Sequence, residues 1–99
     1  MSYNKLMTVF KWNPEKNEIL AVERGITFEE IVHMIEAGAP VIETDHPNPE
    51  KYPNQKILIV NVEGYAYLVP YVQDKDELFL KTIIPSRKAT RKYFGGKND

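Results

Sequence analysis

The sequence predicts an α+β domain in which two N-terminal helices pack on an antiparallel β-meander and a short basic helix closes the chain. Two strong helix-start signals lie in the first third, and β-rich runs separated by turn residues fill the middle. A serine followed by basic residues marks the last helix. Strands joined by short turns form antiparallel meanders, and helices segregated to one side of such a sheet define the α+β class.

Chain length and composition favour one small domain. The chain has 99 residues, too few for two hydrophobic cores, so we expect a single domain spanning residues 1–99. It has no cysteine, which excludes disulfides, thiolate metal sites and cysteine nucleophiles and fits a reducing cytosol. Neither a signal peptide nor an apolar run of membrane-spanning length is visible, so we expect a cytoplasmic protein with no membrane partner.

Two consecutive helices follow a short strand expected at residues 8–11. The first helix starts at Asn13-Pro14-Glu15, with asparagine as N-cap and proline as first helical residue, and ends at Gly25. The second starts at Thr27-Phe28-Glu29-Glu30, a capping box, and ends at Gly38. Apolar residues then repeat at helical spacing.

The remaining elements alternate between β-rich runs and turns. Strands are expected at residues 40–44, 56–62, 65–72 and 78–84, with a proline-rich loop at 45–55 and a closing helix from Arg87 to about Phe94. Strict alternation places Tyr65, Tyr67, Val69 and Tyr71 on one face of their strand. Pro70 cannot donate to a ladder, so we expect it at an edge or a bulge.

Charge is unevenly distributed along the chain. Nine of the fourteen acidic residues lie between positions 15 and 50, whereas positions 78–98 hold six basic residues and no acidic one. On the closing helix, Arg87 and Arg91 share one face, and Lys88 and Lys92 share the next. Like charges at this spacing repel, and a phosphate backbone would offset that repulsion. The alternative is a basic tail that only maintains solubility.

Standard catalytic signatures are absent from the sequence. It has no glycine-rich phosphate loop and no GxSxG motif, and His33 and His46 are not spaced as a metal pair. We therefore expect no metal and no cofactor. His46 lies in the proline-rich loop, where an exposed imidazole titrates near neutrality or serves only as a turn residue. Tyr71 and Tyr93 can stack on a splayed base or donate a hydrogen bond.

Three segments of the chain form a recognisable pattern: FKWNPEKN at positions 10–17, ERGITFEE at 23–30 and IIPSRKATRKY at 83–93. Together they resemble the BrnT family, the ribonuclease toxins of bacterial type II toxin–antitoxin pairs, which have a RelE-like fold. The resemblance extends over positions 9–93. It implies a metal-independent endoribonuclease that inhibits translation and binds RNA. It also implies a cognate antitoxin protein as partner, in a hetero-oligomer or beside a homodimer.

The resemblance also implies a set of site residues. Cleavage by the ribose 2′-hydroxyl needs a base, an acid and positive charge at the developing oxyanion. Arg87, Arg91, Lys81 and Arg24 would supply the charge, Tyr93 the acid and His46 the base. RNA would further contact Lys11, Lys88, Lys92 and Tyr71.

Two positions depart from the family pattern and leave other functions open. The family usually has Lys-His-Gly where this chain has Glu23-Arg24-Gly25, and arginine where it has Thr82. One alternative is a non-catalytic module of the same fold that binds RNA or a protein. Another is an interaction protein whose tyrosine-rich strand is a docking edge.

Overall fold

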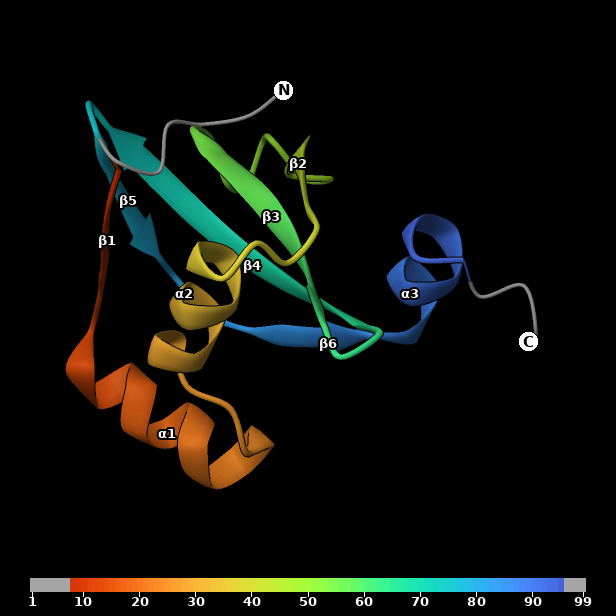
Figure 1. Ribbon diagram of the computed structural model, residues 1–99. Helices are drawn as coiled ribbons and strands as arrows, with labels where there is room; N and C mark the ends of the chain where they lie inside the picture. Colours follow the sequence, from red (N-terminus) through yellow and green to blue (C-terminus); the bar gives the residue numbers. More distant parts are fainter. Residues whose placement is uncertain (1–7, 96–99) are drawn as a thin grey trace.

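The computed structural model describes residues 8–95, which form one six-stranded sheet and three helices (Figure 1). The strands are β1 (Val9–Trp12), β2 (Val41–Asp45), β3 (Gln55–Val62), β4 (Tyr65–Asp74), β5 (Glu77–Leu80) and β6 (Ile84–Ser86). The helices are α1 (Pro14–Arg24), α2 (Phe28–Glu36) and α3 (Arg87–Tyr93). The predicted α+β class is confirmed. Within residues 8–95, no helix combines the length and apolar character that crossing a bilayer requires.

The sheet is mixed, whereas the sequence predicted a purely antiparallel one. Its strand order is β1-β5-β4-β3-β2, and β6 pairs with β4. The antiparallel pairs from β2 to β5 are the predicted meander. β1 joins β5 in parallel, with Val9 opposite Glu77 and Trp12 opposite Leu80. Parallel strands need a long connection, and here the intervening helices and meander provide it.

Both predicted helix starts are confirmed. The side chain of Asn13 accepts from the backbone N–H groups of Glu15 and Lys16, and Gly25 ends α1 in the left-handed conformation with φ 67°. The side chain of Thr27 accepts from the N–H of Glu30, whose side chain accepts in turn from the N–H of Thr27. These reciprocal bonds satisfy backbone N–H groups at the start of α2 that have no partner within the helix. Residues close together in the sequence therefore determine where α2 begins.

The larger core lies between α1, α2 and one face of the sheet. Leu20 of α1 and three residues of α2 (Phe28, Ile31 and Ile35) are at most 2% exposed there. They pack in one cluster with alternate residues of the strands: Leu58, Val60, Val69, Tyr71, Leu78 and Leu80. The predicted face of β4 is thus confirmed, and its burial increases along the strand from the exposed Tyr65 to Tyr71.

α3 covers the opposite face of the sheet, so the helices are not all on one side. Ile57 and Ile59 project to this second face, where they cluster with Ala66 of β4 and Ala89 of α3. The physical reason is the apolar run from Ile57 to Val60, whose four residues are all buried. A strand that is apolar on both faces needs cover on both.

Pro70 divides the predicted last strand in two. Its carbonyl accepts from the N–H of Lys81, so its nitrogen, which carries no hydrogen, faces the same neighbour. The partner segment leaves the ladder at this point, and β5 ends at Leu80 while β6 begins at Ile84. Pro70 therefore lies in a central strand and not at an edge, at the point where the ladder of β4 passes from β5 to β6. β4 has partners on both sides, so the docking-edge hypothesis for the tyrosine-rich strand is wrong.

Candidate nucleic-acid interface

α3 is fixed to the sheet by two residues near its start. Ser86 is the N-cap, and its Oγ accepts from the N–H of Ala89 at 3.0 Å. The hydroxyl of Thr90 donates to the carbonyl of Ser86 at 2.7 Å and accepts from the N–H of Ala66 at 2.8 Å. Thr90 thus satisfies a backbone donor of β4 while holding the helix in place.

The four basic side chains of α3 are exposed to solvent. Ala89 is buried and Thr90 and Tyr93 are half-buried, which defines the inner side of the helix. Arg87, Lys88, Arg91 and Lys92 are all exposed. Both predicted pairs, Arg87 with Arg91 and Lys88 with Lys92, are therefore exposed on a helix that is hydrogen-bonded to the sheet.

An apolar groove of about 350 Å³, which we call the α3 groove, runs between α3 and the end of β2. Its floor is formed by Ile57, Ile59 and Leu68, and its α3 wall by Ser86, Lys88, Ala89, Lys92 and Tyr93. The opposite wall is formed by Thr44, Asp45 and Pro47. The structure thus brings together three of the predicted residues: Lys88, Lys92 and Tyr93.

Lys11 and Lys81 lie on the same face of the sheet as α3. Lys11 is opposite Phe79 in the register, and alternation across β5, β4 and β3 places both on the face of Ile57. The ammonium of Lys81 lies 5.0 Å from the centroid of the Phe79 ring. Lys11 Nζ is 3.4 Å from Glu77 Oε2, so its charge is partly neutralised. This face therefore carries predicted cations from α3, from β1 and from the segment that follows β5.

Arg24 lies on the other face and serves the fold. Its guanidinium donates to the carbonyl of Ile83 at 2.7 Å, in the segment where β5 has ended and β6 has not begun. α1 packs on the face opposite to α3. The structure therefore does not bring Arg24 together with the lysines of the α3 groove.

Tyr71 is not available as a stacking platform. The residue is 1% exposed within the larger core, and its hydroxyl donates to a carboxylate oxygen of Glu43. A base needs an open ring face, so the expectation that Tyr71 stacks on RNA is wrong. The alternation pattern identified its face correctly, but that face is the one covered by α1 and α2.

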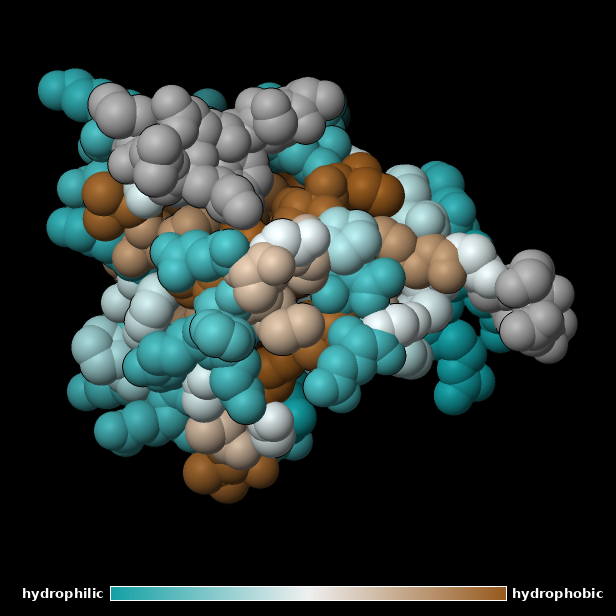
Figure 2. All heavy atoms as spheres, in the orientation of Figure 1, coloured by the Kyte–Doolittle hydropathy of each residue, from teal (hydrophilic) through white to brown (hydrophobic). Residues whose placement is uncertain are grey.

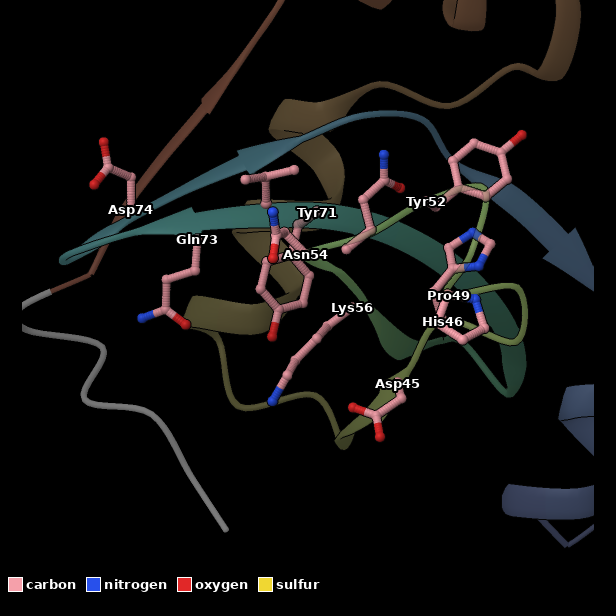
Figure 3. Close-up of a pocket in the computed structure, with 11 residues that line it drawn as sticks. Asp45, His46, Pro49, Tyr52, Asn54, Lys56, Tyr71, Gln73 and Asp74 are labelled. Carbon is pink, nitrogen blue, oxygen red and sulfur yellow. The ribbon is translucent and has the colours of Figure 1, made fainter.

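His46 lies beside the α3 groove but in a separate depression. This His46 groove has a volume of about 710 Å³, and Figure 3 shows the imidazole beside the Tyr52 ring at one end of it. The ring centroids are 4.5 Å apart, and His46 Nδ1 accepts from the N–H of Asn48 at 3.0 Å. A neutral imidazole bonded in this way carries its proton on Nε2, so it is a donor at its open nitrogen. Neither ring nitrogen of this tautomer is then a free proton acceptor, so the geometry does not suit the expected base.

Sequence reasoning missed the polar wall of the α3 groove. Asp45 lines both the α3 groove and the His46 groove, and it is the one acidic residue among those that line the α3 groove. The available signal was the apolar run of β3, because a strand that is apolar on both faces needs cover on both. A short helix covers only part of the second face and leaves a groove beside it.

Comparisons of the chain with protein families, curated proteins and solved structures give no match.

Proposed function

We propose that this protein is a metal-independent endoribonuclease of the toxin type, with the RelE-like arrangement that its resemblance to BrnT toxins implies. The observation that carries the proposal is the outward display of four cations on α3, a helix bonded to the sheet through Thr90. Fixed arginines and lysines neutralise phosphates and hold RNA in register. Such a substrate places the protein in the cytoplasm.

The residues of the α3 groove fit the three roles of the reaction. The ribose 2′-hydroxyl attacks the adjacent phosphorus, and the 5′-oxygen of the next nucleotide leaves with a proton. Asp45, which lines the wall of the groove at the end of β2, takes the 2′-hydroxyl proton. Lys88 and Lys92 stabilise the charge that develops on the phosphate oxygens, and Tyr93 donates the proton to the leaving oxygen.

The double variant Arg87→Ala/Arg91→Ala tests the RNA-binding part of the proposal. We expect it to relieve growth arrest on induction in bacteria, because two phosphate contacts are lost. Lys16→Ala/Lys75→Ala is the matched control, since it removes the same charge from α1 and from the β4–β5 turn. Circular dichroism of the purified variants verifies folding. A folded double variant that arrests growth like the parent would contradict the assigned interface.

Asp45→Asn tests the catalytic part. The amide cannot accept a proton, so we expect cleavage of a labelled RNA to fall by about 10²–10⁴-fold, the usual contribution of a general base. RNA binding should remain or strengthen slightly, because a negative charge leaves a cationic groove. Single-turnover cleavage and filter binding on one preparation separate the two effects. Cleavage at the parental rate would remove Asp45 from the mechanism.

The proposal includes a cognate antitoxin that blocks the interface. Such proteins restrain their toxins by direct binding, in a hetero-oligomer. Co-expression with the reading frame adjacent to this one should restore growth and yield a complex that copurifies. Loss of RNA binding in that complex would show that the antitoxin covers the α3 face.

A non-catalytic RNA-binding module is the second candidate, and the position of Arg24 favours it. This residue stands where the family usually has histidine, and its guanidinium is engaged by the carbonyl of Ile83. A binding module retains RNA with strong salt dependence and leaves it intact. Incubation of the purified protein with labelled RNA, followed by gel analysis of the products, distinguishes the two functions.

A further inference from the structure

The α3 groove has two chemically distinct parts. Its floor is apolar, with Ile57 and Ile59 buried and Leu68 half-buried. Its α3 rim carries the ammonium groups of Lys88 and Lys92, and neither forms an ion pair within residues 8–95. A ligand that fits this arrangement has a flat apolar part and a negative charge close beside it.

We propose that the α3 groove holds one unstacked nucleobase of single-stranded RNA, with the flanking phosphates on Lys88 and Lys92. The inference rests on the RNA binding of the proposed function and not on cleavage. It assigns the substrate class, because a base inside a duplex cannot enter a groove between a helix and a sheet. Single-stranded loops and ends, whose bases can be splayed out, are what this site would recognise.

The walls of the groove match a nucleobase better than an apolar side chain. Tyr93 contributes an aromatic ring, over one face of which the Lys92 ammonium lies 5.1 Å from the centroid, and aromatic rings are the usual platforms for unstacked bases. Thr44 on the opposite wall shares the sheet face of Ile57 and adds a hydroxyl, which can bond to the donors and acceptors of a base edge. The volume of about 350 Å³ lies at the lower end of the range for small-ligand sites.

The short length of α3 is the reason that the groove exists. The helix has seven residues and covers Ile57, Ile59 and Ala66 from the β4 side. Ile42 and Leu68 are only partly buried in the same cluster, so the side of the face toward β2 remains open. An acidic apolar peptide would also suit this charge pattern, and it is the competing class that the experiment must exclude.

The experiment compares three fluorescein-labelled probes by polarisation at one salt concentration. They are a single-stranded RNA octamer, the same octamer with abasic sites in place of its central nucleotides, and the octamer in a duplex. The abasic probe keeps every phosphate and removes only the bases. We expect the intact single strand to bind about tenfold more tightly than the abasic probe, within the usual contribution of a stacked base. Weaker binding of the duplex is also expected.

Thr44→Met fills the groove from the half-buried edge of β2 without adding an aromatic ring or a charge, and Val22→Met is the size-matched control on exposed α1. We expect Thr44→Met to abolish the preference for bases and keep the affinity for the abasic probe, whereas Val22→Met leaves both unchanged. Thermal unfolding verifies that each variant is folded. If Thr44→Met does not fold, Thr44→Leu, which crowds the same wall, takes its place.

The outcomes separate this inference from the proposed function. Equal binding of the intact and abasic probes by the parent protein would overturn the base site while RNA binding through α3 stands. Displacement of the RNA by an acidic apolar peptide at lower concentration than by unlabelled RNA would assign the groove to a protein segment. If none of the three probes binds, both proposals fail.

Discussion

Asn17 joins the two N-terminal helices through both ends of its side-chain amide. Its Oδ1 accepts from the N–H of Phe28 at 2.7 Å, and its Nδ2 donates to Glu29 Oε1 at 2.7 Å. The hydrogen bond from Asn17, with a further bond from the backbone N–H of Glu29, holds the pKa of the Glu29 carboxyl below its ordinary value of 4.5. A carboxyl with a lowered pKa stabilises the fold above its unfolded pKa, and this contribution is lost as the pH falls through the folded pKa.

Replacing Asn17 by aspartate should reverse the shift at Glu29. Asn17→Asp keeps an acceptor for the N–H of Phe28 but removes the donor and places a second carboxylate beside Glu29. We expect the pKa of Glu29 to rise relative to the parent protein, because like charges disfavour ionisation. A carbon-13 NMR titration of the Glu29 carboxyl measures this.

The stability of the same variant should depend on pH in a defined direction. Asn17→Asp should lose the most stability at neutral pH, where both carboxylates are charged, and the loss should shrink as the pH falls below about 4. Urea unfolding at several pH values provides the measurement. An unchanged Glu29 pKa, or a loss of stability that is constant with pH, would show that the contact does not set the ionisation of Glu29.

At the scale of elements, the attachment of α3 depends on one hydroxyl. Thr90→Val preserves the side-chain shape but leaves the N–H of Ala66 without its bond and frees the carbonyl of Ser86. We expect a loss of about 1–3 kcal/mol in the free energy of unfolding, the usual cost of an unsatisfied buried group. Thr90→Ser keeps the hydroxyl and is the control.

Urea unfolding of both variants measures that cost. Amide exchange at Ala66 should accelerate in Thr90→Val and remain slow in Thr90→Ser. If the two variants were equally stable, packing of Ala89 and Tyr93 rather than the hydroxyl would hold α3 on the sheet.

Elements whose signals are local could be predicted from the sequence, and long-range pairings could not. The caps at Asn13 and Thr27 act on N–H groups two or three residues away, so the sequence contains the whole interaction. The parallel pairing of β1 with β5 joins residues far apart in the chain, and no local pattern encodes it. The division of the last strand required knowing that Lys81 lies opposite Pro70.

The candidate site shows the same limit. The two faces of α3 follow from helical spacing alone, and the structure displays all four cations as expected. Whether a distant residue lies near these cations depends on which face of the sheet it occupies, and helical spacing does not determine that. Lys11 and Lys81 lie on the α3 face, whereas Arg24 and Tyr71 belong to the opposite side. A residue such as Asp45 becomes a candidate only once the structure shows that it lines the groove, which the sequence alone does not reveal.

Over the whole molecule, acidic and basic residues gather on different elements. α1 carries Glu15, Glu18 and Glu23 around two exposed apolar residues, Ile19 at 47% and Val22 at 86%. Figure 2 shows apolar surface at the lower edge of the molecule, where Figure 1 places α1, with hydrophilic surface beside it. α3 lies on the other side of the sheet with four cations and no acidic residue. A polyanion is therefore attracted to one end of the molecule only.

This separation predicts the salt dependence of the proposed RNA binding. The logarithm of the binding constant for a single strand falls linearly with the logarithm of salt concentration, with a slope of about −0.7 for each phosphate neutralised. Arg87→Ala/Arg91→Ala removes two contacts, so the slope should become less negative by about 1.4. Lys16→Ala/Lys75→Ala changes the net charge equally, but Figure 1 places α1 and the β4–β5 turn away from α3, so its slope should match that of the parent protein. Polarisation titrations across a salt series give all three slopes. Equal changes in the two double variants would mean that net charge alone attracts RNA, and α3 would then lose its assignment as the interface.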